Sequence, residues 1–172
     1  MEGFSRQSQR WFAQRWADRS QRLMARGRLL DAEAAISRSL AVCPDVASFW
    51  VALASVRSRL MRPEAALAAY QTAERLDPEL PLLHLSIGHV LKTLGRRSEC
   101  ERTYQECIAA DPTSGEAYWS LADLKTYRFS DAEIGAMEQA IASGAGGALN
   151  QSRLHFALGR AWEQLRQAKQ LS

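Results

Sequence analysis

The chain has 172 residues, of which 47% are hydrophobic and 24% charged, with a net charge of +3. This composition suits one domain with a continuous core, and it offers neither an apolar run that could span a membrane nor an apolar leader at the start, so we expect a cytoplasmic protein without a membrane partner. Three cysteines without a C-x-x-C spacing argue against a disulfide framework and a structural metal site.

The start of the chain, residues 1–28, is strongly basic, with seven arginines against two acidic side chains. Residues 1–12 are predicted to form a basic tail or helix extension. The next four arginines have spacings of 4, 3 and 4, which places them on one face of a helix; they are Arg15, Arg19, Arg22 and Arg26. This patch fits an anionic partner such as nucleic acid, an acidic protein or a membrane surface. Because no aromatic residue is interleaved in the stripe, we favour a solvated outer face and expect no nucleic-acid partner.

Three prolines are evenly spaced along the chain, at Pro44, Pro78 and Pro112. Around each proline, large and small residues recur at fixed positions, as they do where two helices of a hairpin pack closely. The 34-residue period that these positions define is typical of tetratricopeptide (TPR) repeats, in which helix-turn-helix units stack on one another. We therefore predict an all-α, TPR-type α-solenoid whose first three repeats span residues 13–46, 47–80 and 81–114.

Residues 115–142 are predicted to form a divergent fourth repeat. Ser130 followed by Glu133 has the pattern of a capping box at the start of a second helix, as does Ser98 followed by Glu101. The interval between the two serines is two positions shorter than the interval between the prolines, so the turn of the fourth repeat is shortened.

A Gly-rich loop is predicted at residues 143–150, followed by a terminal, unpaired helix at residues 151–172. No partner helix follows to cover the apolar side of this helix, which includes Phe156, Trp162 and Leu165. We expect the helix to dock on the fourth repeat and to leave an exposed patch that promotes a homodimer.

In stacked TPR repeats, the first helix of each repeat lines a concave groove. Repeat positions predict a groove of mixed chemistry that suits a peptide or an extended protein segment. The clamp of lysine and asparagine in chaperone-type TPR domains is absent, because the matching positions hold Ala17, Gln21, Ala52, Leu82 and Ser86. The predicted lining residues are Val51, Ser55, Arg59, Leu85, His89, Lys92, Trp119, Asp123, Tyr127, Phe156 and Arg160.

No set of side chains has the spacing of a catalytic or metal site, so we expect neither an enzyme nor a cofactor. His89 lies on the predicted groove, but the pattern places no nucleophile beside it. The glycines at 144–147 follow a helix rather than a strand and lack the lysine of a phosphate-binding loop.

Residues 115–134 (GEAYWSLADLKTYRFSDAEI) and 154–159 (LHFALG) resemble bacterial TPR-containing sulfotransferases. The resemblance covers most of the chain and is most specific from residue 115 to 165. It implies a TPR array that precedes a domain using 3′-phosphoadenylyl sulfate as the sulfuryl donor. The sequence lacks that family's Pro-Arg-Ser-Gly-[ST] donor loop, so no catalytic residue carries over. Three functions stay open: a peptide-binding module, part of a sulfotransferase whose catalytic domain is missing, and an anion contact through the arginine stripe.

Overall fold

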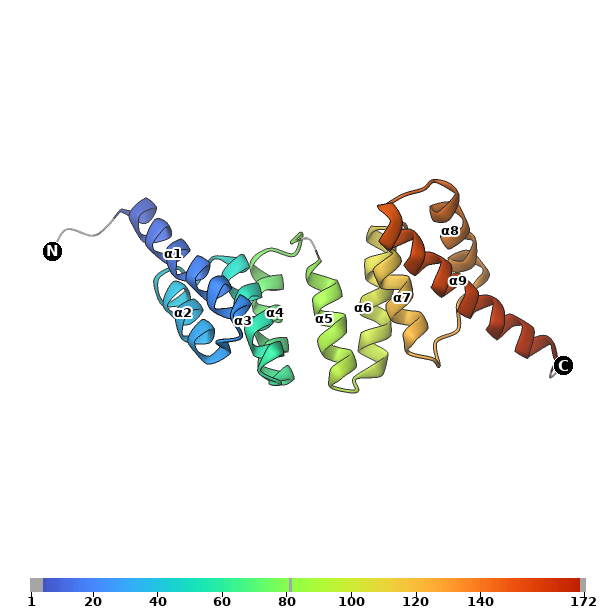
Figure 1. Ribbon diagram of the computed structural model, residues 1–172, viewed down its shortest axis with the longest axis horizontal. Coiled ribbons are helices and arrows are strands. Elements are labelled where there is room, and N and C mark those ends of the chain that lie inside the picture. The colour runs from blue at the N-terminus through green and yellow to red at the C-terminus, as the bar shows by residue number, and fades with distance from the viewer. Residues whose placement is uncertain (1–4, 81, 171–172) are drawn as a thin grey trace. The chain divides into compact units, whose positions relative to one another are not determined.

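The computed structural model describes residues 5–80 and 82–170, which form nine α-helices and no strand. The chain divides into two compact units, residues 1–96 (unit 1) and 97–172 (unit 2). Unit 1 contains α1 (Arg6–Ala25), α2 (Leu29–Val42), α3 (Ala47–Arg59), α4 (Pro63–Leu76) and α5 (Leu83–Thr93), and unit 2 contains α6 (Arg97–Ala110), α7 (Gly115–Asp123), α8 (Asp131–Ala142) and α9 (Gly147–Gln170) (Figure 1).

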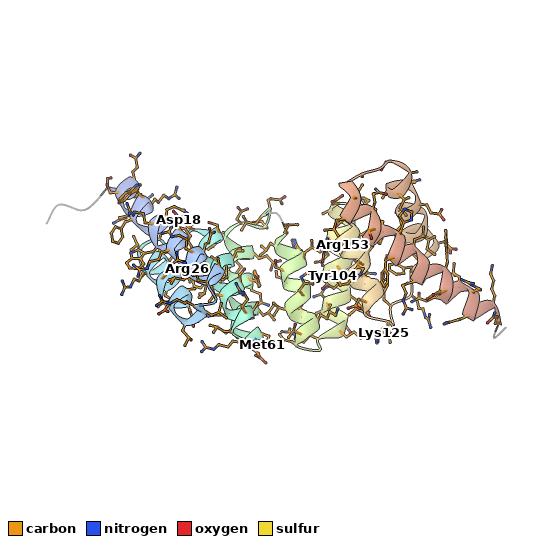
Figure 2. All side chains as sticks on the ribbon, in the orientation of Figure 1. Asp18, Arg26, Met61, Tyr104, Lys125 and Arg153 are labelled. Atoms are coloured by element: carbon orange, nitrogen blue, oxygen red, sulfur yellow. The ribbon has the colours of Figure 1, made fainter. Side chains whose placement is uncertain are left out.

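Unit 1 is built from stacked helical hairpins. Helix α1 packs against α2 and α3 against α4, and neighbouring hairpins meet where α2 contacts α3 and α4 contacts α5. The turns after α1, α3 and α5 each contain one residue with a positive φ, at Gly27 (74°), Met61 (58°) and Gly95 (69°). The backbone of the turn therefore repeats with the same period as the prolines. Met61, labelled in Figure 2, adopts this left-handed conformation although its Cβ crowds the next carbonyl oxygen.

Two buried serines join α1 to α2. The Ser20 hydroxyl donates to the carbonyl oxygen of Ala32, and the Ser39 hydroxyl donates to that of Ala13, both at 2.8 Å. Both serines are at most 1% exposed, so each hydroxyl is buried with its hydrogen bond satisfied. The small side chains at this interface allow the two helices to approach closely.

In unit 2, α9 packs against α7 and α8, and α6 packs against α7. The starts of α7 and α9 are in close contact: the Gly115 amide donates to Asn150 Oδ1 at 2.8 Å, and a Cβ on Gly115 would lie 2.5 Å from the Asn150 carbonyl oxygen. Helix α9 begins at Gly147, before the predicted boundary at 151, because the left-handed glycines 144, 146 and 147 complete the reversal by that residue.

The connection between α7 and α8 departs from the hairpin turns of unit 1. After α7 ends, Lys125 has a φ of 58°, and the chain then turns inward so that Tyr127 and Phe129 are 8% and 7% exposed. Their rings meet edge to face with centroids 5.0 Å apart, and Phe129 also lies 6.4 Å from the ring of Tyr118. Two aromatic side chains from the loop therefore fill part of the core of unit 2.

The capping box predicted at the start of α8 is confirmed. The Ser130 hydroxyl accepts a hydrogen bond from the Glu133 amide at 3.3 Å, and the Ser130 amide donates to Glu133 Oε2 at 2.8 Å. The glutamate also accepts from the Tyr127 hydroxyl at 2.5 Å. The cap thus fixes the entry of α8 and the position of the buried loop at the same time.

Candidate functional site

Helices α7 and α9 of unit 2 run in the same direction, because the start of α7 contacts the first half of α9 and the loop after α7 contacts the second half. Arg153 forms an ion pair with Glu116, and Gln164 Nε2 donates to the Tyr127 carbonyl oxygen at 2.8 Å. The two contacts have the same separation along the sequence, 37 positions. Helical spacing places Trp119 and Asp123 on the same face of α7 as Glu116, and Phe156 and Arg160 on the same face of α9 as Arg153. We call these six residues the α7–α9 face: Glu116, Trp119, Asp123, Arg153, Phe156 and Arg160.

This face combines apolar anchors with charges of both signs. Phe156 is 48% exposed and Trp119 is half-buried, so aromatic surface of both rings can be covered by a ligand. Arg160 is half-buried and is held by Glu163 at 3.1 Å on its own helix. The labelled Arg153 in Figure 2 lies on α9. Four of the predicted groove residues therefore share one face, and the Glu116–Arg153 pair beside them was not predicted from the sequence.

Tyr127 is a correction to the predicted groove. Repeat positions predict Tyr127 on the groove, one turn beyond Asp123, but α7 ends at Asp123 and Tyr127 lies in the following loop. Its hydroxyl donates to Glu133 and accepts from Gln105 Nε2 at 2.8 Å, so both roles of this hydroxyl are used within unit 2. Burial, followed by the hydrogen bond to Glu133, raises the pKa of Tyr127 well above the ordinary tyrosine value. Its side chain is structural.

The other predicted groove residues lie in unit 1, on α3 and α5. On α3, Val51 is half-buried, Ser55 Oγ is 3.2 Å from the hydroxyl of Tyr70, and exposed Arg59 donates to the Met24 carbonyl oxygen of α1 at 3.0 Å. Ser55 and Arg59 thus also hold helices together. On α5, His89 is exposed, and Leu85 and Lys92 are half-buried.

A second surface lies on α1, on the side opposite the residues that pack into unit 1. Arg15, Arg19, Arg22 and Arg26 are all exposed, as the 4, 3, 4 spacing predicts. The premise that this stripe lacks aromatic residues is wrong. The Arg15 guanidinium lies 4.9 Å from the Trp11 ring, and that of Arg19 lies 5.3 Å from the Trp16 ring. The signal was present in the sequence, because Trp11 precedes Arg15 by four positions and Trp16 precedes Arg19 by three.

The ionisable groups of unit 2 with shifted pKa values are three buried tyrosines and the half-buried Cys107. Burial raises the pKa of Tyr118 to about 12 and that of the Cys107 thiol to about 11. A thiol with a raised pKa is a poor nucleophile at neutral pH. Among the described residues, no three histidine, cysteine or acidic side chains are grouped as a metal ion would need. None of the described helices combines the length and apolar character required to cross a bilayer.

Family models identify repeats in the middle of the chain. Residues 62–95 match a TPR repeat model and residues 83–114 match a tetratricopeptide repeat model. The chain therefore contains TPR repeats. No curated protein sequence matches the chain significantly.

Solved structures with a similar fold include MamA, with 18% identity over 91% of this chain and 81% of that one (TM-score 0.61). Residues 41 to the end of MamA from Desulfovibrio magneticus RS-1 match with 18% identity over 92% and 94% of the two chains (TM-score 0.65). The first TPR domain of Spaghetti (RPAP3), bound to the HSP90 peptide SRMEEVD, matches with 16% identity over 76% and 93% (TM-score 0.59). At these identities the likeness concerns the fold alone, and it confirms the predicted all-α, TPR-type solenoid.

Proposed function

We propose that this chain is a non-catalytic interaction module that binds a peptide or protein segment on the exposed faces of its first helices. The observation that carries the proposal is the α7–α9 face, where Trp119 and Phe156 occupy matching positions between the Glu116–Arg153 ion pair and the charged residues Asp123 and Arg160. Aromatic side chains that are partly exposed beside charged groups are the usual anchors of a protein interface.

The chemistry of this face favours a ligand with an apolar anchor and charges of both signs. An apolar side chain seated against Phe156 gains about 25 cal/mol for each Å² removed from water. Arg160, which is held by Glu163, and the exposed Asp123 present charge of both signs beside this anchor. The TPR domain of RPAP3 was solved with an acidic peptide, but in this chain the positions that match the chaperone-type clamp lack lysine and asparagine. We therefore expect a different peptide sequence.

A peptide array probed with the full chain would test the proposal. We expect Trp119→Ala and Phe156→Ala each to weaken the selected peptide at least tenfold, since truncation of an anchor aromatic typically costs about 2 kcal/mol or more. The expectation that Phe156 and Trp162 share one side of α9 is wrong, because six positions of a helix separate them by about 240°. Trp162→Ala is therefore the matched control, with 50% exposure on another side of α9. If Trp119→Ala and Phe156→Ala bind the peptide as the parent does, the ligand does not use this face.

In unit 1, Arg59 is the predicted cationic anchor. Its bond to the Met24 carbonyl oxygen means that Arg59→Ala removes a helix contact as well as a charge. Arg59→Lys keeps the charge and loses the fork geometry of the guanidinium. We expect both variants to lower the affinity for a ligand that reaches α3. An unchanged affinity in Arg59→Ala would remove α3 from the proposed surface.

The resemblance to TPR-containing sulfotransferases adds a finer proposal, that such a module accompanies a sulfuryl-transfer enzyme. The buried positions of Tyr127 and Phe129 and the capping box at Ser130 give residues 127–133 a structural role without any donor. We therefore expect the isolated chain to give no heat with 3′-phosphoadenylyl sulfate in titration calorimetry. Measurable binding of that donor would support the enzyme alternative instead.

The proposed homodimer and the cytoplasmic location rest on separate features. On α9, Trp162 and Leu165 are 50% and 39% exposed, which leaves apolar surface for a second copy. Light scattering that finds a monomer at every concentration would refute the dimer.

The three cysteines are free thiols, two of them buried, which fits a reducing compartment such as the cytoplasm.

A further inference from the structure

Helix α1 carries a concentration of positive charge that no ion pair among the described residues neutralises. Together with Arg26, which caps its C-terminal end, the helix holds six arginines and one acidic residue, Asp18. Within the described part of the chain, none of the four arginines of the stripe forms an ion pair. Elsewhere in unit 1, arginines do have acidic partners, with Arg28 paired to Asp31 at 2.8 Å and Arg57 to Glu33 at 3.0 Å. The charge on α1 is therefore available to an anion from outside. Figure 2 labels Asp18 and Arg26 at this helix.

Exposed aromatic rings accompany these arginines. Trp11 is 61% exposed and Phe12 is 50% exposed, values that are high for side chains of this size. Arg15 lies over the ring of Trp11, while Trp16 is approached by Arg19 and, at 4.4 Å, by Arg38 of α2. A guanidinium that stacks on a ring keeps its N–H groups pointing outward at its edges, where they can bind phosphate oxygens.

The surface of α1 has two shallow hollows that share Phe12 as a wall. One has a volume of 230 Å³ and is lined by Phe12, Arg15, Trp16, Arg19 and Arg22. The other, of 410 Å³, is lined by Gln7, Ser8, Trp11 and Phe12. Each hollow has an aromatic wall against which a planar group can lie, and the first also has three cationic side chains at its rim.

We propose that this surface, the α1 face (Trp11, Phe12, Arg15, Arg19, Arg22 and Arg26), binds single-stranded nucleic acid. The arginines contact successive phosphates, and bases stack on the exposed rings of Trp11 and Phe12. The stripe from Arg15 to Arg26 is about 16 Å long at about 1.5 Å per helical residue. A stacked strand rises about 3.4 Å per nucleotide, so the stripe spans about five nucleotides, within the range of known single-strand sites.

Other anionic partners fit this surface less well. A membrane-surface helix needs a continuous apolar face, but the apolar stripe of α1, including Ala13, Ala17 and Leu23, is already buried in unit 1. An acidic peptide supplies carboxylates without a regular series of flat rings. A duplex hides its bases inside the stack and leaves Trp11 and Phe12 without partners. A single strand presents phosphates and unpaired bases together, which is the combination that the α1 face can receive.

Salt dependence measures the phosphate contacts. Fluorescence anisotropy of labelled dT20 and U20 with the full chain, at increasing KCl concentrations, is expected to give a slope of log K against log salt of about −2.8 if four phosphates are neutralised. Arg19→Gln with Arg22→Gln is expected to reduce the slope by about 1.4. Arg75→Gln is the control, because Arg75 is exposed on α4 of the same unit. The two oligonucleotides separate DNA from RNA as the preferred strand.

The aromatic substitutions measure stacking. Trp11→Leu and Phe12→Leu keep apolar surface but remove the aromatic ring. Each is expected to lower the affinity for dT20 about fivefold or more. Trp162→Leu, at a similar exposure on α9, should leave the affinity unchanged. Circular dichroism establishes that the variants fold, as expected for exposed positions.

Several results would overturn the proposal. These are absence of dT20 and U20 binding, binding that the α1 variants leave intact, and a duplex of equal length that binds as tightly. Polyglutamate or phosphatidylserine vesicles that bind as tightly as dT20 at the same salt would identify an acidic protein or a membrane as the partner. Because the α1 variants leave Trp119 and Phe156 in place, failure here is independent of the peptide-binding proposal.

Discussion

Unit 1 and unit 2 use the same helical hairpin but connect its helices differently. In unit 1, a single left-handed residue reverses the chain, and the reversal recurs once per repeat at Gly27, Met61 and Gly95. In unit 2, the α7–α8 connection is a loop that inserts Tyr127 and Phe129 into the core. The regular turn depends on local backbone conformation alone, whereas the irregular one depends on tertiary packing, so the two should respond differently to substitution.

The same contrast appears in the charges. Unit 1 has 14 lysines and arginines against 9 acidic residues, and its excess lies on α1. Unit 2 has 8 against 10, and on its α7–α9 face Glu116 and Arg153 pair with each other. One unit thus offers unneutralised positive charge and the other a mixed surface, which is why we assign them partners of different chemistry.

The largest expected effect is loss of the inserted ring. Phe129→Ala removes a side chain that is 7% exposed and packs against Tyr118 and Tyr127, so we expect the free energy of unfolding of unit 2 to fall by about 3–5 kcal/mol. Urea denaturation followed by circular dichroism measures the change. Lys125→Ala, in the same loop but exposed, is the control. A loss below about 1 kcal/mol for Phe129→Ala would mean that the loop does not contribute to the core.

A smaller effect is expected where α7 and α9 meet. Gly115→Ala would place a methyl group 2.5 Å from the Asn150 carbonyl oxygen, so the helices must shift at a cost of about 1–3 kcal/mol. Gly135→Ala is the matched control, because no atom lies within 4 Å of that position on α8, and there alanine should stabilise the helix by about 1 kcal/mol. Equal thermal midpoints for the two variants would contradict the close contact.

The pH dependence should also distinguish the units. Three of the four tyrosines lie in unit 2, and burial raises the pKa values of Tyr104, Tyr118 and Tyr127, that of Tyr118 to about 12. An unfolded tyrosine ionises near a pH of about 10. Because the folded pKa values are higher, the stabilising contribution is complete below the unfolded pKa and is lost as the pH rises from there through the folded pKa values.

Urea denaturation of the protein between about pH 9 and about pH 11.5 would measure this loss. Tyr118→Phe should flatten the decline in stability, because it removes one buried ionisable group whose hydroxyl makes no hydrogen bond among the described residues. An identical decline in the variant would show that Tyr118 does not ionise with the pKa given above.

The hairpins could be predicted from the sequence, because the prolines and the small residues recur once in each stacked repeat. The position of Tyr127 could not be predicted from the sequence. The shortened fourth repeat ends α7 at Asp123, and the loop that follows is held by tertiary contacts to Glu133 and Gln105. The aromatic character of the α1 face was missed for another reason. Trp11 and Phe12 precede the first full repeat, so the repeat positions did not single them out. The spacing of four that stacks Arg15 on Trp11 lies within α1 and is visible in the sequence, whereas the approach of Arg38 of α2 to Trp16 depends on how the hairpin packs.

The smallest expected effect concerns the one non-glycine residue among the three periodic turns of unit 1. Met61→Gly should stabilise unit 1 by about 0.5–1 kcal/mol. A left-handed conformation costs a non-glycine residue about 1–2 kcal/mol, and the greater conformational entropy of glycine in the unfolded chain cancels part of the gain from removing that cost. Met61 is 78% exposed, so little packing is lost. The reciprocal variant Gly95→Ala, at the equivalent turn, should destabilise by a similar amount, and differential scanning calorimetry would record both shifts. If Met61→Gly lowers the midpoint instead, the side chain of Met61 makes a stabilising contact that outweighs the backbone strain, and the three turns are not equivalent.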